Sequence, residues 1–176
     1  AENSIVVASG ANMLLNEQDV DKVVEEMCEG DILLMQLEIP IQTVEYAARR
    51  AFEKGVKVVL NPAPARSLPK ELLRYLFMIT PNRIEAEMLT GIKIVNDADA
   101  ERVAKEISAM GVRNIIVTLG SKGCLVREGD TSYCVDAFKV EPVDTTAAGD
   151  TFNGALCVGL AEGMNLRQAA VMASKA

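Results

Sequence analysis

Short apolar runs rich in β-branched residues alternate along the chain with longer segments whose apolar residues recur every three to four positions. The short runs are typical of buried strands, and the longer segments are typical of amphipathic helices. Strands are predicted over residues 5–7, 31–37, 57–60, 76–80, 115–117, 124–126 and 131–135. Strands that alternate with helices in this way predict an α/β fold built around a mostly parallel sheet.

Capping residues mark where the predicted helices begin and end. Asn16 is expected to cap a helix that turns Val23 inward. Pro40 is expected to start a helix that turns Phe52 inward. Further helices are predicted over residues 83–89, from Asp97, over residues 148–163 and from near Leu166. A Glu-Gly-Asp turn at residues 128–130 separates the last two predicted strands and indicates an antiparallel hairpin.

Composition and charge narrow the class of protein. The chain has 176 residues, of which 49% are hydrophobic and 24% charged, so residues 1–176 are expected to form a single domain with a buried core. A formal charge of -7 argues against a nucleic acid as the main partner. No apolar run approaches the roughly 20 residues that a membrane-spanning helix needs. We therefore expect a cytoplasmic protein that does not associate with a membrane.

The chain contains no histidine, which limits the acid–base chemistry that it can perform. Catalytic arrangements of the Ser-His-Asp and Cys-His kinds are excluded. Carboxylates, lysines and cysteines remain as candidates, and a general base is expected to be Asp or Glu.

The segment over residues 144–152 combines small residues with an acid at a predicted helix start. Ala147, Ala148 and Gly149 would let backbone N–H groups approach a ligand, and the start of a helix favours an anion such as phosphate. Asp150 would then lie beside that anion, where it could accept a proton from a hydroxyl group that attacks phosphorus. Alternatively, Asp150 is only a favourable charge at the start of its helix.

Two familiar nucleotide-binding motifs are missing, because the sequence contains neither G-x-x-x-x-G-K-S/T nor G-x-G-x-x-G. This argues against Walker-type ATPases and against dinucleotide-dependent oxidoreductases. A glycine-bearing loop does follow a predicted strand, with Thr118, Gly120 and Gly123 at positions where a nucleotide could lie close to the backbone. A simple turn between two strands explains the same residues.

Other polar residues lie where predicted strands end. Asn82 and Glu85 share one helix face, and their oxygens could hold the water ligands of magnesium. The same pair also has the spacing of a helix capping box. Glu38 follows an apolar strand directly, where a carboxylate suits sugar hydroxyl groups, although an exposed loop position is the simpler explanation.

Five segments together resemble the ribokinase-like (PfkB) carbohydrate kinase family. The string DTTAAGDTFNGAL over residues 144–156 is similar to the C-terminal signature of that family. The other four segments follow in the family's order: LMQLE ending at Glu38, NPAPA from Asn61, TPNRIEAEMLTG from Thr80 and TLGSKG from Thr118. The resemblance implies a Rossmann-like three-layer α/β/α fold with a mostly parallel central sheet, called the ribokinase-like fold.

The resemblance also implies roles in catalysis and sugar binding. Asp150 matches the catalytic base that contacts the sugar and takes the proton from its primary hydroxyl group. Ala147, Ala148 and Gly149 match the anion hole around the transferred phosphoryl group. Ala147 stands where the family usually has glycine, a change that we expect to be harmless. Glu38 matches a glutamate that binds the sugar.

Nucleotide and magnesium roles follow from the same resemblance. Asn82 and Glu85 match the family's N-x-x-E motif, which organises Mg²⁺, its waters and phosphate. Thr118, Gly120 and Gly123 match residues that line the ATP site, to which Gly149 and Asn82 also contribute.

A monovalent cation site is implied as well. Asp144 and the backbone carbonyl of Thr146 match part of a potassium site that shapes the anion hole.

The resemblance implies an ATP-dependent sugar kinase that converts D-ribose to D-ribose 5-phosphate and whose small-molecule partners are the sugar and ATP. A fructokinase, a nucleoside kinase or an inactive nucleotide-binding fragment are the alternatives. Family likeness and ordinary domain size lead us to expect the C-terminal portion, roughly two-thirds, of a longer kinase. The N-terminal segments and the β-strand lid, through which such kinases often form homodimers, are expected to be absent.

Overall fold

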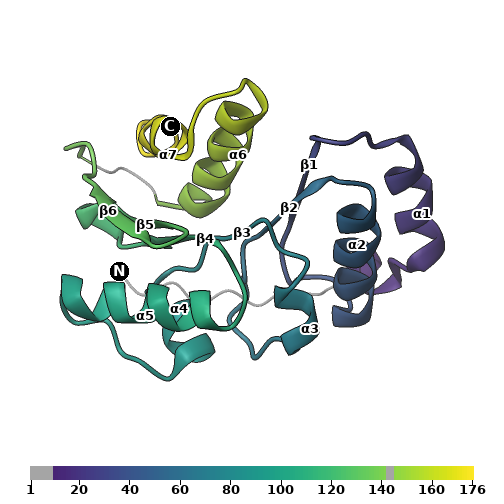
Figure 1. Ribbon diagram of the computed structural model, residues 1–176, viewed down its shortest axis with the longest axis horizontal. Helices are drawn as coiled ribbons and strands as arrows, with labels where there is room; N and C mark the ends of the chain where they lie inside the picture. The colour runs from purple at the N-terminus through teal and green to yellow at the C-terminus, as the bar shows by residue number, and fades with distance from the viewer. Residues whose placement is uncertain (1–9, 142–144) are drawn as a thin grey trace.

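A computed structural model describes residues 10–141 and 145–176 and contains one six-stranded sheet in this part of the chain (Figure 1). The strand predicted over residues 5–7 and the predicted potassium ligand Asp144 lie outside the described residues. The strands, in sheet order, are β1 (Ile32–Met35), β2 (Lys57–Leu60), β3 (Met78–Ile79), β4 (Asn114–Thr118), β5 (Cys124–Glu128) and β6 (Thr131–Val135). β1 to β4 pair in parallel, whereas β5 and β6 are antiparallel and form the predicted hairpin.

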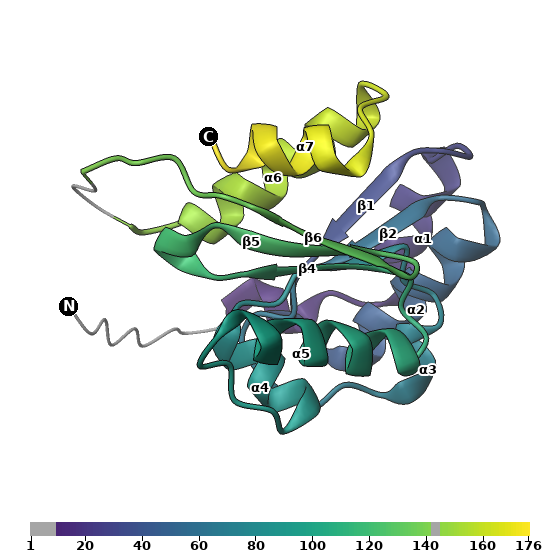
Figure 2. The same ribbon diagram turned by 60° about the vertical axis from the view of Figure 1, so that its left-hand side comes forward.

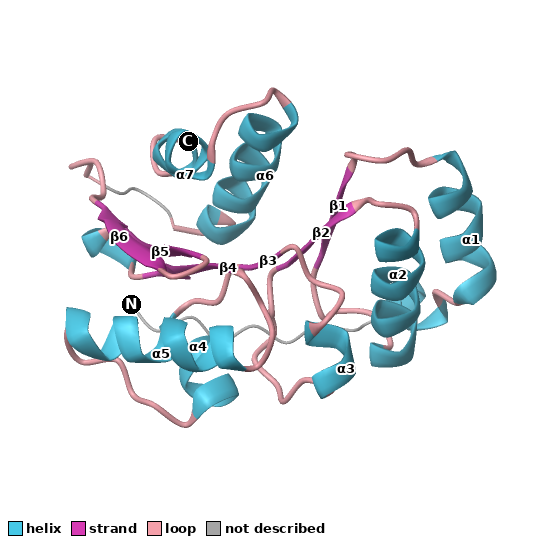
Figure 3. Ribbon diagram, viewed as in Figure 1, coloured by secondary structure: helices cyan, strands magenta, loops and turns pink. Residues whose placement is uncertain are grey.

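Helices cover both faces of the sheet, which confirms the predicted three-layer α/β/α fold (Figures 1 and 2). The helices are α1 (Glu17–Glu26), α2 (Ile41–Glu53), α3 (Lys70–Leu73), α4 (Arg83–Thr90), α5 (Asp97–Ala109), α6 (Ala148–Ala161) and α7 (Leu166–Ala173). Two 3₁₀ helices complete the described elements, η1 (Gly10–Leu14) and η2 (Gly120–Lys122). α6 and α7 lie on one face, and α2 to α5 lie on the other, with α1 beside α2 at the outer end (Figure 3).

Alternating side chains explain why both faces of the sheet need a helical cover. In β2, Val58 and Leu60 belong to the core beneath α2 to α5, whereas Val59 belongs to the core beneath α6 and α7. All three side chains are fully buried. Because successive strand residues point to opposite faces, a nearly continuous apolar run such as β2 is stable only when both faces are covered.

Capping boxes start several helices. Asn16 accepts hydrogen bonds from the backbone N–H groups of Gln18 and Asp19, as its predicted capping role requires. The helix that was predicted to be capped by Asp97 is instead capped by Asn96, and Asp97 is its first residue. The shift has a simple cause, since the side chain three residues after Asn96 is Asp99, which completes the box.

Two residues predicted to face inward are exposed. Val23 is 58% exposed because α1 turns only the face with Val20 and Val24 toward the core. Phe52 is 53% exposed, and its ring lies 5.7 Å from the ring of Tyr75 at the surface. In both helices, the buried face is therefore narrower than the apolar pattern predicted.

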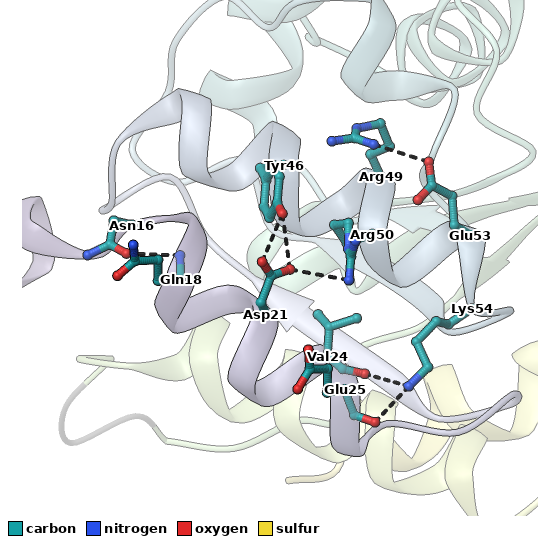
Figure 4. Close-up of polar contacts among 10 residues, drawn as sticks. All are labelled: Asn16, Gln18, Asp21, Val24, Glu25, Tyr46, Arg49, Arg50, Glu53 and Lys54. Carbon is teal, nitrogen blue, oxygen red and sulfur yellow. Dashed lines mark hydrogen bonds and ion pairs between the residues drawn. The ribbon is translucent and has the colours of Figure 1, made fainter.

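Polar contacts attach α1 to α2 (Figure 4). The Nζ of Lys54 donates to the backbone oxygens of Val24 and Glu25, at 2.7 and 2.8 Å. These carbonyls lie in the last turn of α1, where a positive charge also offsets the negative end of the helix dipole. The Tyr46 hydroxyl donates to Asp21, and burial together with that carboxylate raises the pKa of Tyr46.

β1 forms one edge of the described sheet, because it pairs with β2 alone within residues 10–141 and 145–176. Leu34 in this strand is 38% exposed on the face that carries α6. None of the helices in the described ranges combines the length and the apolar composition that crossing a bilayer requires.

The contact between Lys54 and α1 generates a prediction about stability. Lys54→Met keeps most of the aliphatic length but removes two charge-assisted hydrogen bonds, and we expect the free energy of unfolding to fall by about 1 kcal/mol. The measurement is urea-induced unfolding followed by circular dichroism. Lys105→Met serves as the matched control, since Lys105 is an exposed lysine of α5. Equal effects of the two substitutions would show that the contact contributes nothing to stability.

Candidate active site

Asp150 lies in the first turn of α6, at the edge of the sheet where the parallel strands end. The residue is exposed, and its Oδ1 accepts a 2.8 Å hydrogen bond from the Nε2 of Gln36, which follows β1. A pocket of about 290 Å³ opens beside Asp150. Its lining residues are Leu34, Met35, Gln36, Asn61, Asp150 and Asn153.

Three polar residues stand in a row at the ends of neighbouring strands, and two of them, Gln36 and Asn61, line this pocket. Gln36, Asn61 and Thr80 each stand two positions after an apolar residue that faces α6. Those apolar residues lie beside one another in the sheet, in the order Leu34, Val59 and Met78. Because side chains alternate along a strand, the three polar side chains point to the same face. We call Gln36, Asn61 and Thr80 the polar row.

The polar row is hydrogen-bonded to α6. Asn61 donates through Nδ2 to the backbone oxygen of Thr80 at 3.1 Å, and Thr80 Oγ1 donates to Asn153 Oδ1 at 2.7 Å. Asn153 in turn donates to the backbone oxygen of Gly149 at 2.9 Å. Asn61, Thr80 and Asn153 are all buried, so buried hydrogen bonds tie the first turn of α6 to the sheet.

Sequence reasoning assigned no role to Gln36, Asn61, Thr80 or Asn153. The sequence nevertheless contained one sign of the polar row, since each of its residues follows an apolar strand residue by two positions. Asn153 follows Asp150 by three positions and so lies close to it on α6.

The turn before α6 has an unusual backbone. Ala147 has φ 58° and ψ 14°, which places a residue with a Cβ atom in the left-handed region. An L-residue pays roughly 1–2 kcal/mol for that conformation, which glycine adopts without strain. Thr146, Ala148 and Gly149 are exposed around this turn. The replacement of glycine by Ala147 is therefore compatible with the fold but carries a cost.

Asn82 and Glu85 form the capping box of α4. Asn82 Oδ1 accepts from the backbone N–H groups of Ile84 and Glu85, both at 2.9 Å. The Glu85 carboxylate accepts from the backbone N–H of Asn82 at 2.8 Å and from its Nδ2 at 2.7 Å. Glu85 is only 5% exposed, and burial raises the pKa of its carboxyl group against the opposing effect of the Asn82 N–H.

Of the two roles that the sequence allowed for Asn82 and Glu85, the structure therefore contains the helix cap. A carboxylate can accept about four hydrogen bonds, so Glu85 retains capacity for the water ligands of a metal. Within the described residues, no group of three or more Asp, Glu or Cys side chains is arranged to hold a metal ion by itself.

The glycine-bearing turn lies beside α4. Thr118 forms an isolated parallel bridge with Asn82, and the Arg83 side chain donates to the backbone oxygen of Leu119 at 3.0 Å. The structure therefore brings the two segments that were predicted to bind ATP and magnesium together. Gly120, at φ 63°, is exposed on the outer side of this turn.

Glu38 lies apart from these contacts. It is exposed and lines a second pocket of about 350 Å³, whose walls are mainly apolar residues of α1 and β1. Leu34, Met35 and Gln36 line both pockets. Glu38 and Asp150 thus line two pockets that share these three residues.

Comparison with known proteins identifies the class of enzyme to which this architecture belongs. The family described as pfkB family carbohydrate kinase matches residues 1–176. The chain therefore belongs to the pfkB family of carbohydrate kinases.

Several curated relatives carry more particular names. A ribokinase of Haemophilus influenzae is 47% identical over 162 residues, which cover 92% of this chain and 53% of the relative. A deoxyribokinase of Salmonella typhi is 37% identical over 155 residues, which cover 88% of this chain and 51% of the relative. The chain spans about half the length of these relatives.

Solved structures of ribokinases share the fold of this chain. A ribokinase of Arabidopsis thaliana, solved in complex with ribose and ATP, superposes with a TM-score of 0.87 at 30% identity. The match covers 98% of this chain and 57% of that structure. A ribokinase of Thermotoga maritima superposes with a TM-score of 0.85 at 37% identity, over 98% of this chain and 57% of that structure. The predicted ribokinase-like fold is confirmed.

The two glycines of the turn should respond differently to substitution. A Cβ atom at Gly123, which has φ 88°, would overlap the backbone oxygen of Val135 and approach Ala137 N to 2.7 Å. Gly123→Ala should therefore lower the free energy of unfolding by roughly 2–5 kcal/mol. Gly120→Ala has open space around it and should cost about 1–2 kcal/mol for its positive φ alone. Denaturant unfolding measures both, and similar losses would contradict the predicted clash.

Glu85 should make stability depend on pH. Its pKa in the folded protein lies above the usual value of 4.5, so its contribution to stability is fully present below pH 4.5 and is lost as pH rises through the folded pKa. Glu85→Gln lacks this titration. We expect the parent protein to lose stability relative to Glu85→Gln as the pH rises above 4.5, as measured by urea unfolding.

The control for this experiment is Glu87→Gln, which removes one exposed negative charge from the same helix. A difference between the parent and Glu85→Gln that stays constant across the pH range would contradict the prediction.

Proposed function

We propose that the complete protein carrying this chain is an ATP-dependent kinase that phosphorylates D-ribose to D-ribose 5-phosphate. One observation carries the proposal: Asp150 stands in the first turn of α6, beside a pocket at the carboxyl ends of the parallel strands. Ligands of open α/β sheets bind at this edge. The 47% identity with a ribokinase supports the choice of sugar.

Asp150 serves as the general base. Its carboxylate takes the proton of the sugar's primary hydroxyl group while the hydroxyl oxygen forms a bond to the γ-phosphorus of ATP. The bond between that phosphorus and the bridging oxygen breaks, and ADP leaves with the electron pair. The carboxylate is exposed beside its pocket, which leaves it accessible to such a hydroxyl group.

The start of α6 stabilises the transferred phosphoryl group. The first N–H groups of a helix lack partners within the helix and carry partial positive charge. Ala147, Ala148 and Gly149 have small or absent side chains, so phosphate oxygens can come close to this backbone. The charge that develops during transfer would meet these N–H groups in a fixed orientation.

ATP binds along the neighbouring segments. Thr118, Gly120 and Gly123 line the nucleotide, with Asn82 at its phosphates. Support comes from the bridge between Asn82 and Thr118, which places α4 against this turn. Glu85 is suited to hold Mg²⁺ through its water ligands, and the metal would neutralise charge on the phosphates when bound with ATP.

Glu38 binds the sugar hydroxyl groups from the pocket that adjoins the one beside Asp150. Its exposed carboxylate and the pocket that it shares with Gln36 support this role. A potassium ion at Asp144 and the Thr146 carbonyl completes the proposal and rests on the family resemblance alone. The cytoplasmic location and a homodimer through a lid stay predictions from the sequence.

Replacement of Asp150 tests the base. In the complete protein, Asp150→Asn should lower kcat by roughly 10²- to 10⁴-fold, because the amide cannot accept the proton, while ATP still binds. A coupled ADP-release assay and calorimetry measure the two quantities. Asp130→Asn in the β5–β6 turn, whose side chain is fully exposed, is the matched control. Retained turnover in Asp150→Asn would refute the base assignment.

The same assay decides the sugar. D-ribose should give the highest kcat/KM in a panel with 2-deoxy-D-ribose, D-fructose and adenosine. Preference for another member of the panel would replace ribose as the substrate and leave the role of Asp150 intact.

A further inference from the structure

Gln36 has an orientation that its neighbours fix. Its Nε2 donates to Asp150 Oδ1 at 2.8 Å and to Asn61 Oδ1 at 3.3 Å. A carboxylate can only accept hydrogen bonds, so the NH₂ end of the Gln36 amide must face Asp150. Gln36 is half-buried, and it is the side chain of the polar row that contacts Asp150 directly.

The orientation of Asn61 is fixed from the opposite side. Its Nδ2 donates to the backbone oxygen of Thr80, which can only accept, so its Oδ1 is the end that faces Gln36. Asn61 is 8% exposed, and turning its amide over would leave two buried polar groups without partners. The Thr80 carbonyl therefore fixes the orientation of the Asn61 amide, and Asn61 in turn fixes the orientation of the Gln36 amide.

The helix that carries Asp150 is held by the same network. Thr80 donates to Asn153, and Asn153 donates to the Gly149 oxygen, one residue before Asp150. Asp150 is thus restrained twice, through its backbone by Asn153 and through its carboxylate by Gln36. Among the described residues that line the Asp150 pocket, Asp150 is the only charged one.

We propose that Gln36 is the positioning residue of the catalytic base: its amide holds Oδ1 of Asp150, so that Oδ2 is the oxygen presented to the sugar hydroxyl group. This inference rests on the proposed function, since it needs Asp150 to be the base. Within the described residues, the hydrogen bond from Gln36 reaches Oδ1, and no other side chain donates to Oδ2. A carboxylate restrained at one oxygen loses fewer orientations when the substrate arrives, and misplacement of a reacting group by about 1 Å can cost about 10²-fold in rate.

The first test removes the donor. In the complete protein, Gln36→Leu keeps a similar size but cannot donate, and kcat should fall roughly 10- to 100-fold with little change in the KM for ATP. Gln42→Leu makes the same chemical change at an exposed position on α2 and should leave kcat unchanged. Thermal unfolding of both variants shows whether the fall in kcat occurs without a loss of stability. An unchanged kcat in Gln36→Leu would overturn the proposal.

The second test remains informative even when Gln36→Leu folds poorly. Gln36→Glu is isosteric and places a second carboxyl group within hydrogen-bond distance of Asp150. Two carboxyl groups at that distance share a proton, so the acidic limb of kcat/KM against pH should move to higher pH by at least about 1 unit. A limb that stays where it is in the parent would mean that residue 36 does not stand beside the base in the working enzyme, and that result would refute positioning.

A double variant separates this proposal from the assignment of the base. If Gln36 acts through Asp150, Gln36→Leu should add little to the loss already caused by Asp150→Asn. Full additivity would mean that Gln36 acts elsewhere. An inactive Asp150→Asn together with a fully active Gln36→Leu refutes only the positioning role, whereas an active Asp150→Asn refutes both.

Discussion

The parallel register of β1, β2 and β3 is the constraint on which the rest of the site depends. Leu34 lies beside Val59, and Val59 lies beside Met78. A one-residue slip between two strands would turn a member of the polar row to the opposite face, into the core beneath α2 to α5. The apolar residues of the strands therefore fix the alignment of the polar ones, and packing of the core determines the geometry of the pocket.

Buried hydrogen bonds hold α6, and with it Asp150, in a fixed position on the sheet. Thr80 is 1% exposed and Asn153 is 4% exposed. Separating them would leave Asn153 Oδ1 without its donor and the Thr80 hydroxyl with only a 3.5 Å contact to the Leu60 oxygen, and a buried polar group left unpaired costs about 1–3 kcal/mol. α6 cannot slide along the sheet without that loss. Glu85 likewise combines two roles, because its carboxylate caps the start of α4 and is also proposed to bind the water ligands of a metal.

Much of the fold could be predicted from the sequence, because its strands are short apolar runs bounded by turns. The predicted strands over residues 57–60 and 131–135 coincide with β2 and β6. β1 and β3 are shorter than predicted, although single backbone hydrogen bonds such as that from Leu37 N–H to the Ala63 oxygen continue past the strand ends. α3 was missed because four residues after Pro69 give no helical period. Val23 and Phe52 were misjudged because apolar residues at a helix border need a tertiary partner to be buried.

The site was less accessible to sequence reasoning. The small residues before Asp150 drew attention to it, and the resemblance favoured its role as the base. The spacing of Asn82 and Glu85 allowed both a cap and a metal-binding role, and the structure contains the cap. Gln36 was overlooked because its contact with Asp150 spans 114 positions along the chain. No local pattern encodes such a contact, and it becomes visible only when strand order and register are known.

Ala147 shows how one methyl group can alter a turn beyond its cost in stability. At φ 58° a glycine would be relaxed, but it could also visit many other backbone angles. Alanine has few alternatives, so the unfolded chain has less freedom to lose and the turn has fewer ways to open. The turn at the start of α6, which we propose receives the phosphoryl group, is thereby stiffened before any ligand arrives, and the strained backbone angle is the energetic cost of that rigidity.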